Sequence, residues 1–270
     1  MVERQGSTTL AERRARQLRH DAERHEHQQT RHHLLATERR TSEQLRNLAQ
    51  AAAARFDRPE TTTAEVLTWV AETFGYRTAV ACSMADAVLP AVVAEHLPWV
   101  DTLFLDTGYH FAETLGTRDA IEASLRLTII DVRPRQSIVE QDAEFGERLH
   151  DRDPSLCCAL RKVQPLHEAL QNYEVWIAGV RRDEGESRAH TPWVTWDDKN
   201  GLVKVNPLVN WSFDDVMTYA GEHDITVNPL VADGYPSIGC APCTRRVDPG
   251  EDPRAGRWAG FSKTECGLHT

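Results

Sequence analysis

The chain has 270 residues, of which 40% are hydrophobic and 27% charged, and its formal net charge at pH 7 is −10. This composition is typical of a folded globular protein, and the near-average contents of 15 Gly and 13 Pro exclude collagen-like and low-complexity chains. No apolar run reaches the roughly 18 residues of a membrane span, and the acidic net charge argues against a nucleic acid as a general partner.

Residues 1–40 are rich in Arg, Glu, Gln and His and poor in aromatic and β-branched residues. Such a segment cannot bury a core of its own, so we expect a charged extension that is disordered or helical. It also lacks the apolar stretch of a secretory signal, so we expect a cytoplasmic protein. A packed domain is expected over 41–245. The residues after it, 246–270, are short of apolar side chains and predict a mobile C-terminal tail.

Within 41–245, a helical apolar pattern begins at Leu45, and a second helix follows that the threonines at 61–63 can cap and Gly75 can end. Short apolar runs then alternate with amphipathic stretches. Strands are predicted at 77–82, 101–105, 126–132 and 174–178, and helices at 86–96, 111–124, 137–149, 156–172 and 212–222. This alternation predicts an α/β fold with a parallel, twisted sheet that helices cover on both faces.

Three unusual loops follow predicted strands, at 83–86, 106–110 and 179–182. Ligands of open α/β sheets bind at the carboxyl ends of the strands. We therefore expect these loops to form the binding site.

Four of the six cysteines form two pairs, Cys157 with Cys158 and Cys240 with Cys243. Structural disulfides are rare in the cytoplasm, so paired thiols there suggest metal ligands or reactive groups. Four soft ligands suit Zn²⁺ or an iron–sulfur cluster, and the diverging side chains of Cys157 and Cys158 favour a cluster with several irons. The alternative is a redox dithiol at Cys240 and Cys243, with the other pair merely buried.

The remaining two cysteines differ in their surroundings. Cys266 is predicted to lie on the C-terminal tail, with Lys263 and His269 nearby in sequence. An exposed thiol among positive charges favours a nucleophile, and the alternative is a surface cysteine without a function. Cys82 ends an apolar strand, so we expect it in the core.

Several separate motifs between residues 60 and 270 carry a resemblance to a known family. They are Leu105-Asp106-Thr107-Gly108 followed by Glu113-Thr114, CCALRKVQPL at 157–166, WIAGVRR at 176–182, KVNPL at 204–208, GYPSIGC at 234–240 and KTECGLH at 263–269. Together they resemble the assimilatory adenylyl-sulfate reductases, the iron–sulfur members of the sulfonucleotide reductase family. The loop Ser83-Met84-Ala85-Asp86 lacks a glycine that is frequent in this superfamily and is similar to the loop of actinobacterial members.

The resemblance implies a fold of the adenine nucleotide alpha hydrolase type, also called the PP-loop type. It implies thioredoxin-dependent reduction of adenylyl sulfate to sulfite and AMP, in sulfate assimilation and cysteine biosynthesis. Cys266 would be the catalytic nucleophile and would form an S-sulfocysteine intermediate. A 4Fe-4S cluster would be held by Cys157, Cys158, Cys240 and Cys243.

The implied reaction brings a thiolate toward a sulfate, so the site needs cations that offset the repulsion between two anions. Arginine suits this task because its planar fork can donate two hydrogen bonds to an oxyanion. The expected substrate-binding residues are Ser83, Asp106, Thr107, Gly108, Lys162, Gly179, Arg188, Arg254, Arg257 and His269.

Three alternative functions stay open. The first is a reductase of 3′-phosphoadenylyl sulfate, or of both nucleotides. The second is a thiolation or adenylation enzyme on the same fold, which the loop at 83–86 and the Cys266 tail disfavour. The third is a non-catalytic iron–sulfur sensor whose Arg-rich N-terminus contacts a nucleic acid. A homo-oligomer is compatible with each.

Overall fold

The computed structural model describes residues 10–35, 37–261, 263 and 265–268. The chain divides into two compact units, Met1–Glu38 and Arg39–Thr270. The described residues of the first unit contain one helix, α1 (Leu10–Leu35). No helix in the described residues is both long and apolar enough to cross a membrane.

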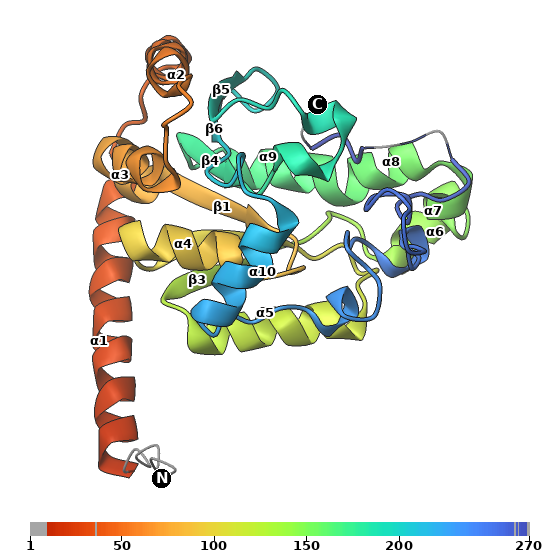
Figure 1. Cartoon of the computed structure of the whole chain (residues 1–270), viewed down its shortest axis with the longest axis horizontal. Helices are drawn as coiled ribbons and strands as arrows, with labels where there is room; N and C mark the ends of the chain where they lie inside the picture. Colours follow the sequence, from red (N-terminus) through yellow and green to blue (C-terminus); the bar gives the residue numbers. More distant parts are fainter. Residues whose placement is uncertain (1–9, 36, 262, 264, 269–270) are drawn as a thin grey trace. The chain divides into compact units, whose positions relative to one another are not determined.

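The second unit is built on a six-stranded sheet, shown in Figure 1. Its strands are β1 (Thr78–Cys82), β2 (Val100–Leu105), β3 (Leu127–Val132), β4 (Val175–Ala178), β5 (Val194–Asp197) and β6 (Leu202–Val205). They lie in the order β3-β2-β1-β4-β6-β5, and every neighbouring pair is parallel except β5 with β6. The predicted α/β class is therefore confirmed, with one antiparallel edge strand.

Successive residues of a strand point to opposite faces of the sheet, and the core divides accordingly. Val80 and Ile177 belong to one apolar cluster, whereas Ala79 and Trp176 belong to another. The first cluster is completed by α2 (Ser42–Phe56), α3 (Thr63–Phe74), α4 (Val88–His96) and α10 (Phe213–Glu222), and the second by α9 (Gln164–Leu170). A third cluster forms where α5 (Ala112–Ser124) packs Ile121 against β2 and β3. Helices thus cover both faces, as predicted (Figure 1).

Strands β5 and β6 were absent from the sequence-based prediction. They form a short antiparallel hairpin of four residues each, with no helix between them. The strand–helix alternation that indicates a parallel sheet does not reveal such a hairpin, because its signal is only two short apolar runs.

The predicted helix over 156–172 is one helical stretch that changes its winding. It starts as α8 (Pro154–Cys158), passes through a π-helical turn at Ala159–Val163 and continues as α9. The Gln164 N–H donates to the carbonyl of Ala159, five residues back. Pro165 explains the change, because it has no N–H to donate to the residue four positions earlier. The predicted helix over 137–149 is also shorter, since α6 (Ile138–Phe145) ends before a glycine and α7 (Leu149–Arg152) follows separately.

The segment 246–270, for which the sequence predicts a mobile tail, belongs in its described residues to the second unit. Thr244 and Arg257 form an antiparallel bridge, and the Trp258 N–H donates to the carbonyl of Cys243 at 3.0 Å. The Trp258 side chain is 3% exposed. The segment therefore packs on the domain in this state, and its opening during turnover stays a prediction.

Candidate active site

A cavity lined by many of the expected residues lies where the order of the strands reverses. The chain runs from β1 to β2 and β3 on one side of the sheet, and then returns to β4 on the other side of β1. Ligands of α/β sheets bind at such a switch point, at the carboxyl ends of the strands. Ser83 follows β1 and Gly179 follows β4, and both line a cavity of about 230 Å³. The expected position of the site is in agreement with this geometry.

Most of the expected functional side chains line this one cavity. They are Ser83, Lys162, Gly179, Arg188, Arg254, Arg257 and Cys266. His269 lies outside the described residues. The residues Asp106–Gly108 do not line the cavity, whereas their neighbours Leu105 and His110 do.

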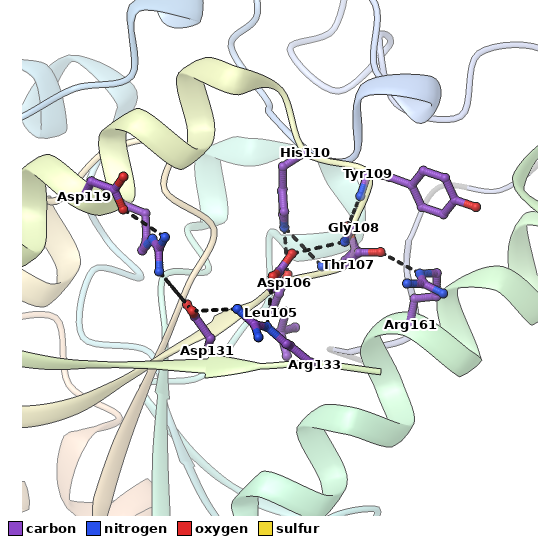
Figure 2. Close-up of polar contacts among 11 residues, drawn as sticks. Leu105, Asp106, Thr107, Gly108, Tyr109, His110, Asp119, Asp131, Arg133 and Arg161 are labelled. Carbon is purple, nitrogen blue, oxygen red and sulfur yellow. Dashed lines mark hydrogen bonds and ion pairs between the residues drawn. The ribbon is translucent and has the colours of Figure 1, made fainter. Parts of the chain in front are cut away.

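Asp106 and Gly108 shape the loop after β2, which Figure 2 shows. Asp106 accepts a hydrogen bond from the Gly108 N–H at 3.2 Å and another from Arg133 Nε at 3.3 Å. Gly108 has a φ of 75°, and a Cβ there would lie 3.1 Å from Ile138 and 3.3 Å from Arg161. Only glycine adopts this conformation without strain in so little space.

Thr107 connects the same loop to the cysteines. Its Oγ1 lies 3.3 Å from Cys240 Sγ, and its carbonyl oxygen accepts a hydrogen bond from Arg161 Nε (Figure 2). Thr107 is fully buried. The loop after β2 therefore contacts the cysteine pair at 240–243 without lining the substrate cavity.

The four paired cysteines line a second, small cavity beside the first, and all four are free thiols. Cys157 and Cys158 come from α8, and the other two flank the 3-10 turn η6 (Ala241–Cys243). In the described part of the chain, no group of three or more His, Cys, Asp or Glu side chains is arranged to hold a metal ion. The four thiols line one common cavity, and such a soft donor set suits Zn²⁺ or an iron–sulfur cluster.

Lys162 lines both cavities. It is placed by the π-helical turn, where its ammonium group is buried beside Cys240 and Cys158. Burial raises the pKa of the Cys157 thiol to about 12, with a further contribution from the neighbouring thiols. Burial acts in the same direction on Cys240, but the charge of Lys162 holds the pKa of that thiol below its ordinary value. The positively charged Lys162 thus lies between the cysteines and the substrate cavity and acts electrostatically on both.

Arg257 reaches the cavity from the C-terminal segment. Its Nη1 lies 3.3 Å from both Ser237 Oγ and the carbonyl of Ile238, and its guanidinium group lies over the Trp258 ring. A Cβ at Gly239 would lie 2.2 Å from Arg257 Nη2. Glycine at that position therefore makes room for the arginine.

Cys266 lines the cavity next to Glu265, which the sequence analysis did not single out. Arg188 donates two hydrogen bonds to the Glu265 carboxylate, each of 2.9 Å, and Arg254 Nη2 lies 3.2 Å from it. Burial acts against the charge of Glu265, but the hydrogen bonds and charge of Arg188, with the charge of Arg254, hold its pKa below the ordinary value.

Cys82 packs against the third apolar cluster, so the expectation of a core residue is met in part. Its side chain is partly buried and lines the substrate cavity beside Ser83. Burial raises the pKa of the Cys82 thiol to about 12, so this thiol is protonated at neutral pH. Cys82 is therefore poorly suited to supply a thiolate to the cavity.

Comparison with known proteins shows which family the chain belongs to. Residues 68–246 match the family described as phosphoadenosine phosphosulfate reductase domain. The chain belongs to this family. A curated relative from Streptomyces coelicolor, named adenosine 5′-phosphosulfate reductase, is 58% identical over 232 residues, covering 86% of this chain and 98% of the relative. A relative of the same name from Mycolicibacterium smegmatis is 52% identical and covers 85% and 96% of the two chains. The resemblance to actinobacterial reductases is thus confirmed.

A solved structure supports the fold. The phosphoadenylyl-sulfate reductase of Candida auris, solved as a phosphate complex, has a TM-score of 0.59 and 24% sequence identity with this chain. The match covers 76% of this chain and 98% of the other. It confirms the mostly parallel sheet with flanking helices.

Proposed function

We propose that this protein reduces adenylyl sulfate to sulfite and AMP, with Cys266 as the nucleophile and thioredoxin as the electron donor. The observation that carries the proposal is that a single cavity at the strand ends is lined by Ser83, Gly179, Lys162, Arg257 and Cys266. The names of the curated relatives support the substrate. A cytoplasmic location and a role in sulfate assimilation and cysteine biosynthesis belong to the same proposal.

The proposed reaction balances with the thiols of two proteins. The Cys266 thiolate attacks the sulfate sulfur, the bond from that sulfur to the oxygen bridging to phosphorus breaks, and AMP leaves with the electron pair. A thioredoxin thiolate then attacks Cys266 Sγ and releases sulfite. The second thioredoxin thiol resolves the mixed disulfide, so the two electrons come from thioredoxin. Lys162 and Arg257 offset the repulsion between the anions.

The proposal includes a 4Fe-4S cluster on Cys157, Cys158, Cys240 and Cys243. When bound, the cluster would supply a compact charged group that anchors the two loops and acts electrostatically on the substrate site. Protein purified without oxygen should contain iron and acid-labile sulfide in about equal amounts. Stoichiometric zinc without sulfide, or an unliganded dithiol at Cys240 and Cys243, would contradict this part of the proposal.

Radioactive labelling tests the nucleophile. Incubation with ³⁵S-labelled adenylyl sulfate in the absence of thioredoxin should label the protein and release AMP, and thioredoxin should then discharge the label as sulfite. Cys266→Ser should abolish labelling and keep the visible absorption of the cluster. Cys82→Ser is the matched control and should label normally. Persistent labelling of the Cys266→Ser protein would refute the assignment.

The 3′-phosphorylated nucleotide is the second candidate substrate, since the family match itself is described by that nucleotide. We propose that adenylyl sulfate is preferred, because all four cluster-type cysteines are present and line one cavity. The ratio of the two kcat/KM values at one ionic strength decides between them. A tenfold preference for the phosphorylated form, or about 1.4 kcal/mol, would reverse the assignment.

A further inference from the structure

Glu265, the residue before the proposed nucleophile, is held by several charged contacts. The proposed reaction steps do not use its carboxylate. Glu265 is 14% exposed, and its carboxylate receives Nε and Nη2 of Arg188 in a two-pronged contact, with both distances 2.9 Å. Arg254 adds an ion pair of 3.2 Å. Such paired, charge-assisted hydrogen bonds fix geometry as well as adding stability.

Arg188 is itself fixed from the other side. Its Nη1 donates to Glu184 at 2.6 Å, and its side chain is 10% exposed. Glu184 belongs to the 3-10 turn η3 (Arg182–Glu184) and Arg188 to η4 (Glu186–Arg188), both of which follow β4. Three donor nitrogens of Arg188 therefore face carboxylates, and the arginine joins the loop after β4 to the C-terminal segment.

The charges of this group nearly cancel. Two carboxylates, on Glu184 and Glu265, face the two guanidinium groups of Arg188 and Arg254. Lys162 and Arg257 line the same cavity outside this contact, so they remain as the cations for a nucleotide-bound sulfate. In this arrangement Arg188 binds Glu265, which differs from the expectation that Arg188 binds the substrate.

We propose that Glu265 is a positioning residue, whose contact with Arg188 holds the C-terminal segment closed so that Cys266 stays in the substrate cavity. The inference rests on the proposed function only in naming Cys266 as the nucleophile. Arg188 then binds Glu265 when the segment closes. Loss of this contact lets the segment leave the cavity before Cys266 attacks the sulfur.

The test compares Glu265→Gln with a control in the same segment. Glu251 makes a similar two-pronged contact with Arg245, at 3.0 and 3.1 Å, but this contact is away from the cavity. Glu251→Gln therefore removes a two-pronged pair of the same geometry, although a more exposed one, without touching the proposed closure. Both proteins should keep wild-type cluster absorption and a single cooperative thermal unfolding transition.

The first readout is alkylation of Cys266 by iodoacetamide, followed by mass spectrometry of its peptide across a range of pH. The plateau rate at high pH, where the thiol is fully ionised, reports access to the sulfur and is independent of its pKa. Glu265→Gln should raise this plateau at least fivefold, and Glu251→Gln should not change it. An unchanged plateau in Glu265→Gln would overturn the inference.

The second readout separates positioning from substrate binding. The single-turnover rate of Cys266 labelling by adenylyl sulfate should fall at least tenfold in Glu265→Gln, while the Kd for AMP should change less than twofold. Glu265→Asp, which keeps the charge, should recover part of the rate. If AMP instead binds fivefold tighter to Glu265→Gln, the carboxylate competes with substrate for Arg188, and the positioning role is wrong.

A double variant tests whether Glu265 acts through Arg188. If Glu265 acts through Arg188, adding Arg188→Gln to Glu265→Gln should not raise the alkylation plateau further, whereas an additive effect would contradict the coupling. If the wild-type protein forms no labelled adduct, the proposed function fails. The alkylation plateaus still decide the inference in that case.

Discussion

Lys204 shows what burial does to a single side chain near this site. It lies on β6, is 8% exposed, and places its Nζ 5.0 Å from the centre of the Trp176 ring. Burial lowers the pKa of Lys204 to about 8, although the carboxylate of Asp197 acts in the opposite direction. A lysine in the unfolded chain has a pKa of about 10.4.

This difference predicts how stability depends on pH. Between pH 8 and 10 the unfolded chain binds more protons at Lys204 than the folded protein does, so the contribution of Lys204 to stability rises with pH. The free energy of unfolding of wild type minus that of Lys204→Met should increase by roughly 1–2 kcal/mol from pH 7.5 to 9.5. Urea denaturation at both values measures it. An equal change in the two proteins would show that Lys204 titrates normally when folded.

A backbone hydrogen bond between Arg245 and Gly256 holds the C-terminal segment against the residues that follow Cys243. The Arg245 N–H donates to the carbonyl of Gly256 at 2.9 Å, beside the bridge between Thr244 and Arg257. A Cβ at Gly256 would lie 2.3 Å from the backbone oxygen of Arg245. A backbone atom cannot move aside as a flexible side chain can, so any larger residue must separate the two paired stretches.

We therefore expect Gly256→Ala to lower kcat/KM at least tenfold and to reduce the iron content, because the pairing joins Thr244 to Arg257 and Cys243 to Trp258. Gly116→Ala is the matched control. Gly116 lies within α5 and has nothing within 4 Å of the added Cβ, so this change should be neutral or stabilise the protein by up to about 1 kcal/mol. Full activity and iron content in Gly256→Ala would mean that the pairing is dispensable.

At the scale of the whole molecule, the boundary between the two units falls just before a pair of structural arginines. Arg39 donates to the carbonyl of Gln171, and Arg40 donates its backbone N–H and its Nη1 to the carboxylate of Glu174. The Glu174 side chain is 3% exposed. Removing Arg40 would leave a buried carboxylate with fewer partners, which is costly.

Two truncations test this boundary and the function of the extension. A protein that begins at Arg39 should keep kcat/KM within twofold of the full chain. A protein that begins at Thr41 should be less stable to urea by roughly 2–4 kcal/mol. If removal of residues 1–38 abolished sulfite release, the extension would be required for turnover. If the extension bound a nucleic acid and neither protein formed sulfite, a sensor would describe the chain better than a reductase.

The sequence by itself determined those features that depend on neighbours along the chain. Periodicity indicated the α/β class and the four parallel strands β1 to β4, and Thr62 and Gly75 do flank α3 as its caps. The cysteine pairs and the family motifs were readable because their spacing is short and their residue types are chemically specific.

Only the tertiary structure decided which of these residues meet. Arg188 and Glu265 are separated by 77 positions, and Thr107 and Cys240 by 133. No local pattern encodes such contacts, because they depend on the path of the chain between them. For the same reason Glu265 was missed, although it precedes Cys266 directly, and Asp106–Gly108 were expected in a cavity that they support from outside. Local periodicity reports which face of an element is buried, whereas the partner of a buried or charged group is fixed only when the elements pack.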